Sequence, residues 1–556
     1  MLDLRANPFF LDEAGIAWVE DTLASLSLRE KVGQMFCIVS NQESLDTLLR
    51  RYAVIPFGGM TYRAAPSETL RETTEALQHA VKIPLLISAN LENGGSGVAS
   101  DGTEYASQLE TAATGDLRYA ETLGDICGSE GMSVGVNCSF SPVVDVHFNW
   151  RNAIINTRTF GSDPEYVLSC AKAYLRGLGR HGVAATIKHF PGDGVDERDQ
   201  HLLTSVNSLS CEDWDASFGR IYGELIQAGV QSVMVGHILQ PAYSRKLCPG
   251  IADKDIRPAS LSPELLQGLL REKLGFQGVI ITDSAVMTGM RCALPCREIP
   301  AAAVNAGCDM FLFGRNLQED FENLLADAES GKVPLRRIDD AVRRILAMKA
   351  SLGLHRAQRF TSEENTVGCP RHRQLARECA ERAITLVKDT QSLLPISPEK
   401  HRRVWLHVLG DDAGFRGGYP CKEEMVRALT EQGFAVTCFS PEQLTNPRVT
   451  ELKEQYDLIL YVANVVTGAN RTVNRISWDK TACGESPQYV KDIPTLFVSL
   501  GDPYHFVDVP MIPTFINCYA HSPEMISALM DKLLGRSPFT GVSPVDPFCG
   551  MWGAAL

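Results

Sequence analysis

The sequence lacks the features that direct a chain into or across a membrane. It begins MLDLRANPFFLDEAG, without the basic start and apolar stretch of a secretory signal. No apolar run approaches the roughly 20 residues that a membrane-spanning helix needs. We therefore expect a cytoplasmic protein with no membrane partner.

The 16 cysteines do not form a dense framework, and the nearest pair is Cys292 and Cys296. Such a pair could belong to a metal or redox site. It could also be two reduced, buried thiols of a cytosolic protein, which is the interpretation we favour. No cluster of residues has the spacing of metal ligands, so we expect no metal and no other cofactor.

The chain also lacks the positive charge of a nucleic-acid-binding protein. It has 53 Lys and Arg residues against 67 Asp and Glu, a net charge of −14. An acidic chain repels phosphate backbones, so we expect no nucleic-acid partner. With 44% hydrophobic and 22% charged residues the composition is that of a globular protein. Its 556 residues leave room for a large barrel of about 250 residues or more and a second domain.

Short apolar runs alternate with amphipathic stretches over residues 1–355. The runs that we predict to be strands are 32–38, 56–60, 84–90, 137–146, 185–190, 232–238, 278–284 and 308–314. Near-continuous Val, Ile, Leu and Phe is typical of parallel strands that are covered on both faces. Helical periodicity lies between the runs, and Ser27 and Glu30 form a possible capping box. Eight strands with intervening helices predict an α/β fold of the (β/α)8 TIM-barrel type.

A second domain is expected after the barrel. Residues 356–378 are polar without a clear period, which indicates a linker. Over residues 379–556 we predict strands at 404–410, 434–440, 457–465 and 495–501, and helices at 421–433 and 523–534. This order predicts a smaller, open α/β sandwich domain with a parallel sheet.

Polar residues gather where the predicted barrel strands end. They are Asn90, Glu92, Asp145, Lys188, His189, His237 and Asp283. Reactive residues of such barrels lie at the carboxyl ends of the strands, so this set predicts a site for a polyhydroxylated ligand. Asp283 directly follows the apolar run GVIIT, where a carboxylate is costly unless it is used or paired. Alternatively, it caps the next helix.

The segment KHFPGDGVDERDQH (188–201) carries a second candidate group. Its proline and glycines predict an irregular loop after a strand. Asp199 stands two residues before His201, where a carboxylate can orient the imidazole and favour its charged form. Such a pair can donate and accept protons near neutral pH. The alternative is a solvated loop that carries these charges by chance.

This segment resembles the KHFPGHG…D-x-H motif of the β-N-acetylglucosaminidase branch of glycoside hydrolase family 3. Other stretches resemble the family in the same order: SLREKVGQMF (27–36), INTRTFGSDP (155–164), SVMVGHILQP (232–241) and GFQGVIITDSAVM (275–287). AITLVKDTQSLLPI (383–396) and VSLGDPYHFVDVP (498–510) resemble the α/β sandwich domain that follows the barrel in many members. The resemblance covers nearly the whole chain.

The resemblance implies a role for each matching residue. Asp283 matches the catalytic nucleophile, His201 the general acid/base and Asp199 its partner. Lys188, His189 and Arg158 match residues that grip the sugar, and we expect Asn90 and His237 to join them. Asn90 departs from the family's usual Asp, which binds sugar hydroxyls; Asn keeps an oxygen acceptor but loses the charge. Asp193 replaces a histidine of the family loop and receives no role from the sequence.

The implied activity is that of a retaining, exo-acting β-N-acetylhexosaminidase, which releases terminal GlcNAc from an oligosaccharide by double displacement. Three alternatives remain open. The enzyme could use phosphate in place of water and be a phosphorylase, or it could be a β-glucosidase or β-xylosidase of the same family. It could also be a non-catalytic sugar-binding protein.

Overall fold

The computed structural model describes residues 2–356, 366–410, 420–440, 448–466, 468–470, 472–478 and 485–554. The chain forms two compact units. The first comprises Met1–Glu104, Ala120–Asn149 and Pro164–Cys369, and the second comprises Tyr105–Tyr119, Trp150–Asp163 and Pro370–Leu556. Two segments that the sequence places within the expected barrel domain, 105–119 and 150–163, therefore belong to the second unit.

The first unit is a parallel barrel, as the sequence predicts. Its strands, in spatial order, are β10 (Phe311–Leu312), β1 (Phe36–Ser40), β2 (Gly59–Tyr62), β3 (Leu86–Ala89), β4 (Cys138–Ser139), β5 (Ala184–Phe190), β7 (Ser232–Val235) and β9 (Val279–Thr282). A bridge between Ile281 and Met310 joins the two ends of this order. Two short parallel strands, β6 (Ser205–Val206) and β8 (Ile238–Leu239), pair separately.

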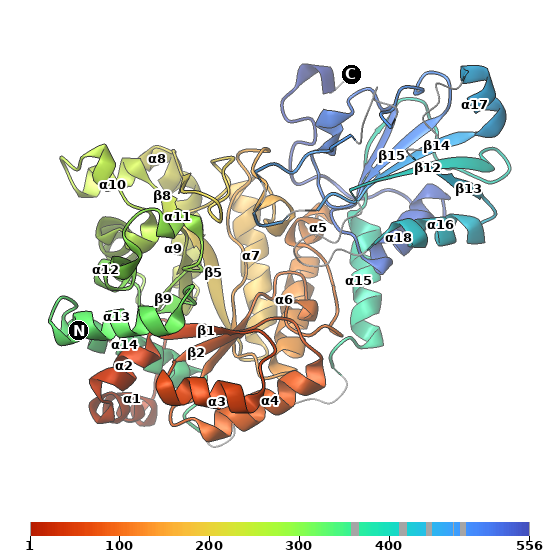
Figure 1. Cartoon of the computed structure of the whole chain (residues 1–556). Coiled ribbons are helices and arrows are strands. Elements are labelled where there is room, and N and C mark those ends of the chain that lie inside the picture. Colours follow the sequence, from red (N-terminus) through yellow and green to blue (C-terminus); the bar gives the residue numbers. More distant parts are fainter. Residues whose placement is uncertain are drawn as a thin grey trace. The chain divides into compact units, whose positions relative to one another are not determined.

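Helices surround the barrel strands (Figure 1). They are α1 (Glu13–Ser25), α2 (Leu28–Gln34), α3 (Leu45–Val54), α4 (Ser67–Ala80), α6 (Leu117–Ser133), α7 (Pro164–Gly179), α8 (Cys211–Trp214), α9 (Arg220–Gln227), α10 (Pro241–Leu247), α11 (Thr288–Arg291), α12 (Ile299–Ala306), α13 (Leu317–Glu329) and α14 (Leu335–Ser351). The capping box of Ser27 and Glu30 is present at the start of α2. That helix continues to Gln34, so the strand expected at 32–38 begins only at Phe36.

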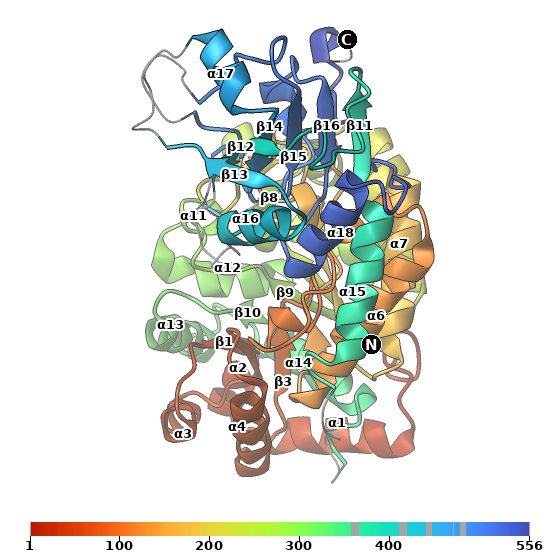
Figure 2. The same ribbon diagram turned by 90° about the vertical axis from the view of Figure 1, so that its right-hand side faces the viewer.

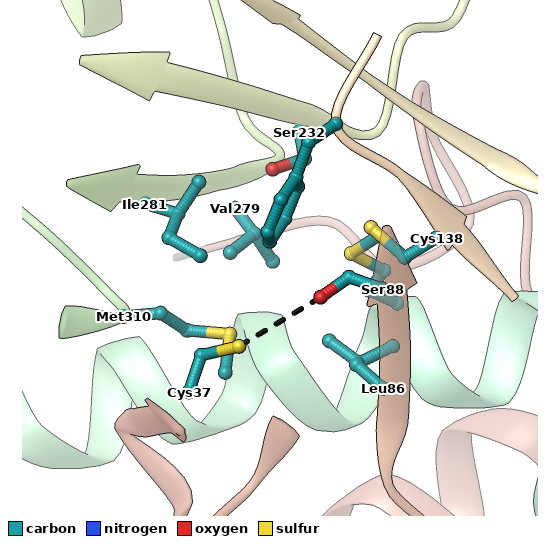
Figure 3. A pocket seen from close by; sticks show the side chains of 10 residues that line it. Cys37, Leu86, Ser88, Cys138, Ser232, Val279, Ile281 and Met310 are labelled. Atoms are coloured by element: carbon teal, nitrogen blue, oxygen red, sulfur yellow. Dashed lines mark hydrogen bonds between the residues drawn. The ribbon is translucent and has the colours of Figure 1, made fainter. Parts of the chain in front are cut away.

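Side chains fill the interior of the barrel. A small pocket there is lined by Cys37, Leu86, Ser88, Cys138, Phe140, Ser232, Val279, Ile281, Met310 and Met348 (Figure 3). The sulfur of Cys37 lies 3.8 Å from the hydroxyl oxygen of Ser88 across this space. None of the predicted site residues lines this pocket. The barrel is therefore a packed core, and its chemistry has to lie at its mouth.

The second unit contains a six-stranded sheet (Figure 2). Its order is β11 (Thr385–Asp389), β16 (Thr514–Asn517), β15 (Thr495–Ser499), β14 (Leu458–Ala463), β12 (Arg403–Leu409) and β13 (Ala435–Cys438). The four predicted strands are present. The sequence analysis missed the short β16 and the partly exposed edge strand β11, which pairs antiparallel with β16.

Both faces of this sheet carry apolar side chains. One face packs with the helices α15 (Pro370–Ala383), α16 (Lys422–Glu431) and α18 (Pro523–Leu533). The other face is rich in aromatic rings and packs with residues from α17 (Val449–Gln455) and later loops. Helix α15 occupies part of the segment 356–378 that the sequence indicated as a linker, while residues 357–365 lie outside the described part.

Two further expectations can be compared with the structure. Among the described residues, no helix is both long and apolar enough to cross a bilayer. Cys292 and Cys296 are free thiols, but both are exposed, so the expectation that they are buried is wrong. They lie on the segment that joins α11 and α12.

A buried charge cluster holds the seam between β9 and β10. Asp309 is fully buried and accepts from Arg271 and Arg337, each at 2.7 Å, and from the backbone N–H of Ile280 at 2.9 Å. Although burial opposes ionisation, the two guanidinium groups hold the pKa of Asp309 below its usual value. The carboxylate therefore ties strand, helix and loop together at the point where the barrel closes.

We expect Asp309→Ala to lower the free energy of unfolding by about 3–5 kcal/mol, because it leaves the buried Arg271 without the carboxylate that it pairs with. Urea unfolding followed by circular dichroism measures the change. Asp46→Ala, which removes an exposed partner of Arg50, is the control and should leave the midpoint in place. An unchanged midpoint for Asp309→Ala would show that the cluster does not stabilise the seam.

Candidate active site at the barrel mouth

Asp283 lies directly after β9, at the carboxyl end of the strand. Its backbone N–H donates to the carbonyl of Val235 at 2.8 Å, and its Oδ1 accepts from the N–H of Ser284 at 2.7 Å. The side chain is 13% exposed. The next helix, α11, begins at Thr288 and has Met287 as its N-cap. Asp283 is therefore not a helix cap, and its carboxylate faces the mouth of the barrel.

Three imidazoles keep Asp283 ionised. Burial alone would raise the pKa of this carboxyl, but His189, His237 and His201 outweigh it and hold the pKa below the usual value. The N–H of Ser284 acts in the same direction. Asp283 is therefore a carboxylate at neutral pH, the form that a nucleophile needs.

His189 stands beside Asp283, with its Nε2 3.8 Å from Oδ2. Its other ring nitrogen, Nδ1, lies 2.7 Å from Oδ2 of Asp145, and its backbone N–H donates to Oδ1 of the same carboxylate at 3.1 Å. Asp145 is fully buried. Because the carboxylate accepts the Nδ1 proton, it fixes the ring so that Nε2 faces Asp283. The sequence placed Asp145 at a strand end but gave no sign of this orienting role.

Lys188 is held between two side chains that follow β3. Its Nζ lies 2.7 Å from Oε1 of Glu92 and donates to Oδ1 of Asn90 at 3.0 Å. Lys188 and Glu92 are each 2% exposed, whereas Asn90 is exposed. The buried ion pair therefore supports an amide that remains accessible at the barrel mouth. This is a suitable arrangement for binding sugar hydroxyls.

The predicted Asp199 and His201 pair is formed. Oδ1 of Asp199 accepts from the N–H of His201 at 2.8 Å and lies 2.7 Å from its Nδ1. Asp199 is buried, while the His201 side chain is 27% exposed. The carboxylate occupies Nδ1, so Nε2 is the atom that can exchange a proton with a ligand. His201 also lies near enough to Asp283 to lower the pKa of that carboxyl.

The loop that carries this pair needs its glycines. Gly192 and Gly194 have φ angles of 118° and 98°, a region that favours glycine. A Cβ on Gly192 would lie 2.4 Å from the ring of Phe218. These constraints agree with the irregular loop that the sequence predicts after β5.

His237 has both ring nitrogens engaged within the protein. Its Nε2 lies 3.0 Å from the carbonyl oxygen of Ser284, and its Nδ1 lies 2.9 Å from Oγ of Ser260. Since a carbonyl can only accept, Nε2 carries a proton. Burial lowers the pKa of His237, while the neighbouring charge of Asp283 acts in the opposite direction. The arrangement favours support of the Asp283 segment over direct contact with a sugar.

Arg158 belongs to the second unit, on the short helical turn Asn156–Arg158. Its guanidinium donates to the carbonyl of Ile154 at 3.3 Å and is partly buried. Its predicted contact with the sugar stays a prediction. Within the described part of the chain, no group of three or more His, Cys, Asp or Glu side chains could hold a metal ion.

The chain is similar to known proteins over most of its length. Residues 27–348 match the family described as "Glycosyl hydrolase family 3 N terminal domain". A β-N-acetylglucosaminidase/β-glucosidase of Cellulomonas fimi is 45% identical, and the match covers 100% of each chain. A β-hexosaminidase A of Pseudoalteromonas piscicida is 26% identical, covering 85% of this chain and 86% of its own.

Solved structures give the same assignment. The β-glucoside phosphorylase BglX is 42% identical, with 99% of each chain covered and a TM-score of 0.94. A family 3 β-N-acetylglucosaminidase from Paenibacillus sp. str. FPU-7 is 26% identical over 94% of this chain and 99% of its own, with a TM-score of 0.80. With the family match spanning more than half of its residues, the chain belongs to glycoside hydrolase family 3.

Proposed function

We propose that the enzyme is a retaining, exo-acting β-N-acetylhexosaminidase that uses Asp283 as nucleophile and His201 as acid/base. The observation that carries this proposal is an ionised carboxylate, Asp283, whose pKa is held down by His189, His237 and His201 at one barrel mouth. The two groups meet the requirement of a retaining glycosidase for an attacking group and a proton donor. The names of the relatives from Cellulomonas and Paenibacillus support the N-acetylglucosaminide as substrate.

In the first step, Asp283 attacks the anomeric carbon and forms a covalent glycosyl-enzyme as the bond to the leaving oxygen breaks. The protonated imidazole of His201 donates its Nε2 proton to that oxygen. Asp199, held against Nδ1 at 2.7 Å, keeps the ring oriented and stabilises its positive charge. In the second step, neutral His201 takes a proton from water, the water oxygen bonds to the anomeric carbon, and Asp283 is released.

The sugar is expected to bind through hydrogen bonds from the mouth. His189 supplies a donor beside Asp283, Lys188 and Asn90 supply donors at neighbouring strand ends, and we assign Arg158 to the same sugar on its match to the family motif. Asn90 offers an amide in place of a carboxylate, so it can donate to a hydroxyl or a carbonyl oxygen. A β-glucoside is the alternative sugar, because the Cellulomonas relative is named for both activities.

Phosphate is the second candidate for the acceptor. His201 leaves the first step as a neutral imidazole, so no carboxylate stands in the acid/base position to repel a phosphate dianion. In this case a phosphate oxygen attacks the glycosyl-enzyme, and the product is a sugar 1-phosphate. The 42% identity to a β-glucoside phosphorylase over 99% of the chain supports this candidate.

Asp283→Ala should lower kcat/KM on every aryl glycoside by about 10⁴-fold or more, because no group remains to form the covalent intermediate. A 2-fluoro glycosyl fluoride should label the wild-type enzyme on the peptide that contains Asp283, as peptide mass spectrometry would show. The control Glu197→Gln changes an exposed side chain of the neighbouring loop and should keep full activity. Label on a different carboxylate would overturn the assignment of the nucleophile.

His201→Ala should affect substrates according to their leaving group. A 2,4-dinitrophenolate departs without a proton, so we expect its release to be slowed by less than about 10-fold, whereas phenol release should slow by about 10²–10⁴-fold. Pre-steady-state release of the phenol measures the first step for each. Equal losses for the two substrates would show that His201 does not protonate the leaving oxygen.

The acceptor is tested with a panel of GlcNAc-, GalNAc- and glucose-terminated disaccharides, with and without inorganic phosphate. As a hydrolase, the enzyme should release free GlcNAc at a rate that phosphate leaves unchanged. As a phosphorylase, it should form a sugar 1-phosphate, which ³¹P NMR detects, and phosphate should raise the rate. Cleavage of glucosides alone would replace the proposed sugar.

A further inference from the structure

Gln200 stands between the two members of the Asp199 and His201 pair and is 1% exposed. A buried amide at the tip of a loop has to find partners for its donor and acceptor atoms. Here the side-chain Nε2 donates to Oδ2 of Asp193 at 3.2 Å, and Oε1 accepts from the backbone N–H of His237 at 2.7 Å. The backbone carbonyl of Gln200 accepts from the N–H of Gly289 at 3.1 Å. We call these three bonds the Gln200 clamp.

The Gln200 clamp connects the loop that carries His201 to two groups around Asp283: the Asp145 and His189 pair, and the segment that follows Asp283. On one side, Asp193 donates its backbone N–H to Oδ1 of Asp145 at 2.8 Å. Asp145 in turn orients His189, the neighbour of Asp283. A continuous series of hydrogen bonds therefore runs from the Asp283 neighbourhood to the residue between Asp199 and His201.

On the other side, the clamp reaches the segment that follows Asp283. His237, whose N–H binds Gln200, holds the carbonyl of Ser284 through its ring. Gly289 lies in α11, and the neighbouring Thr288 donates its N–H to the carbonyl of His201 at 3.1 Å. The nucleophile and the acid/base are thus tied to the same set of groups.

Two glycines allow this close approach. A Cβ on Gly289 would lie 2.7 Å from the carbonyl oxygen of Gln200 and 3.1 Å from Cβ of His237. A Cβ on Gly236 would lie 3.0 Å from Oε1 of Gln200. A side chain at Gly289 would displace the backbone of Gln200, and one at Gly236 would crowd its amide, so both glycines favour the observed position of Gln200.

We propose that Gln200 and Asp193 are positioning residues that hold His201 at the correct distance from the anomeric carbon above Asp283. This inference rests on the proposed function, since it takes His201 to be the acid/base. It also gives a role to Asp193, which stands where the family loop has a histidine. A displacement of about 1 Å in a catalytic group can cost on the order of 10²-fold in rate.

The experiment exchanges the donor and the acceptor of the clamp. Gln200→Glu removes the donor and places two carboxylates side by side, while its oxygen can still accept from His237. Adding Asp193→Asn supplies a new donor toward the Glu and keeps an oxygen for the N–H of Gly194, which now binds Oδ1 at 2.7 Å. A loss that depends on the leaving group, and that is recovered in the double variant, is a readout that loss of folding stability alone cannot produce.

We expect Gln200→Glu to lower kcat/KM for the phenyl glycoside by about 100-fold, but for the 2,4-dinitrophenyl glycoside by less than about 10-fold. The double variant Asp193→Asn/Gln200→Glu should recover the phenyl substrate to within about 10-fold of wild type. The matched control on the same loop is Glu197→Gln, which should change neither. Equal losses on both substrates, or no recovery in the double variant, would overturn the proposal.

A second variant tests the same positioning role if Gln200→Glu does not fold. Asp193→Asn alone leaves one oxygen for two N–H donors, so the same difference between the two substrates should appear, at about 10-fold. Equal changes in kcat/KM for the two substrates would refute the positioning role of the clamp. His201→Ala is measured in parallel: if it shows no leaving-group dependence, the assigned acid/base fails, whereas a dependence in His201→Ala without one in the clamp variants refutes only the clamp.

Discussion

A carboxylate that stays charged inside a barrel needs positive charge and hydrogen-bond donors close around it, and Asp283 has both. Burial would otherwise favour its neutral form, by the cost of taking an ion out of water. His189, His201 and His237 reverse that preference, and the N–H of Ser284 adds a donor. The other features of the site can be understood as the means of keeping these imidazoles in place.

Each imidazole is held by its own hydrogen-bond partners, and these partners differ among the three histidines. Asp145 holds His189 and Asp199 holds His201, each by a carboxylate at 2.7 Å from Nδ1. These carboxylates favour ring orientations that leave Nε2 toward the site. His237 has a hydroxyl and a backbone carbonyl on its ring in place of a carboxylate, and burial lowers its pKa. Two histidines can therefore act on a ligand, while the third maintains the segment that carries Asp283.

The barrel supplies the rigidity on which these distances depend. Its strands close through the bridge between Ile281 and Met310, and the buried Asp309 cluster ties the same seam. Asp283 follows one of the two strands at this seam. Asp283 is thus fixed by a packed core, whereas His201 lies on a loop that depends on individual hydrogen bonds. This difference explains why the loop needs buried polar residues such as Gln200 and Asp193.

The sequence by itself determined the barrel, because parallel strands buried on both faces read as apolar runs, and all eight appear in the structure. It also indicated Asp283 and the Asp199 and His201 pair. A polar residue at the end of an apolar run, and a carboxylate two positions from an imidazole, can be recognised from the order of the residues alone. It missed the edge strand β11, whose side chains are only partly buried, and the helix that begins at Pro370 within a polar stretch.

Only the tertiary structure decided what each polar side chain contacts. Asp145 and His189 are 44 positions apart in the chain, and Gln200 and His237 are 37 apart. No periodicity links such pairs, because they meet only when neighbouring strands of the barrel end at the same mouth. For this reason the sequence could list His237 as a sugar ligand and leave Asp193 without a role. The fold gives both of them structural partners around Asp283.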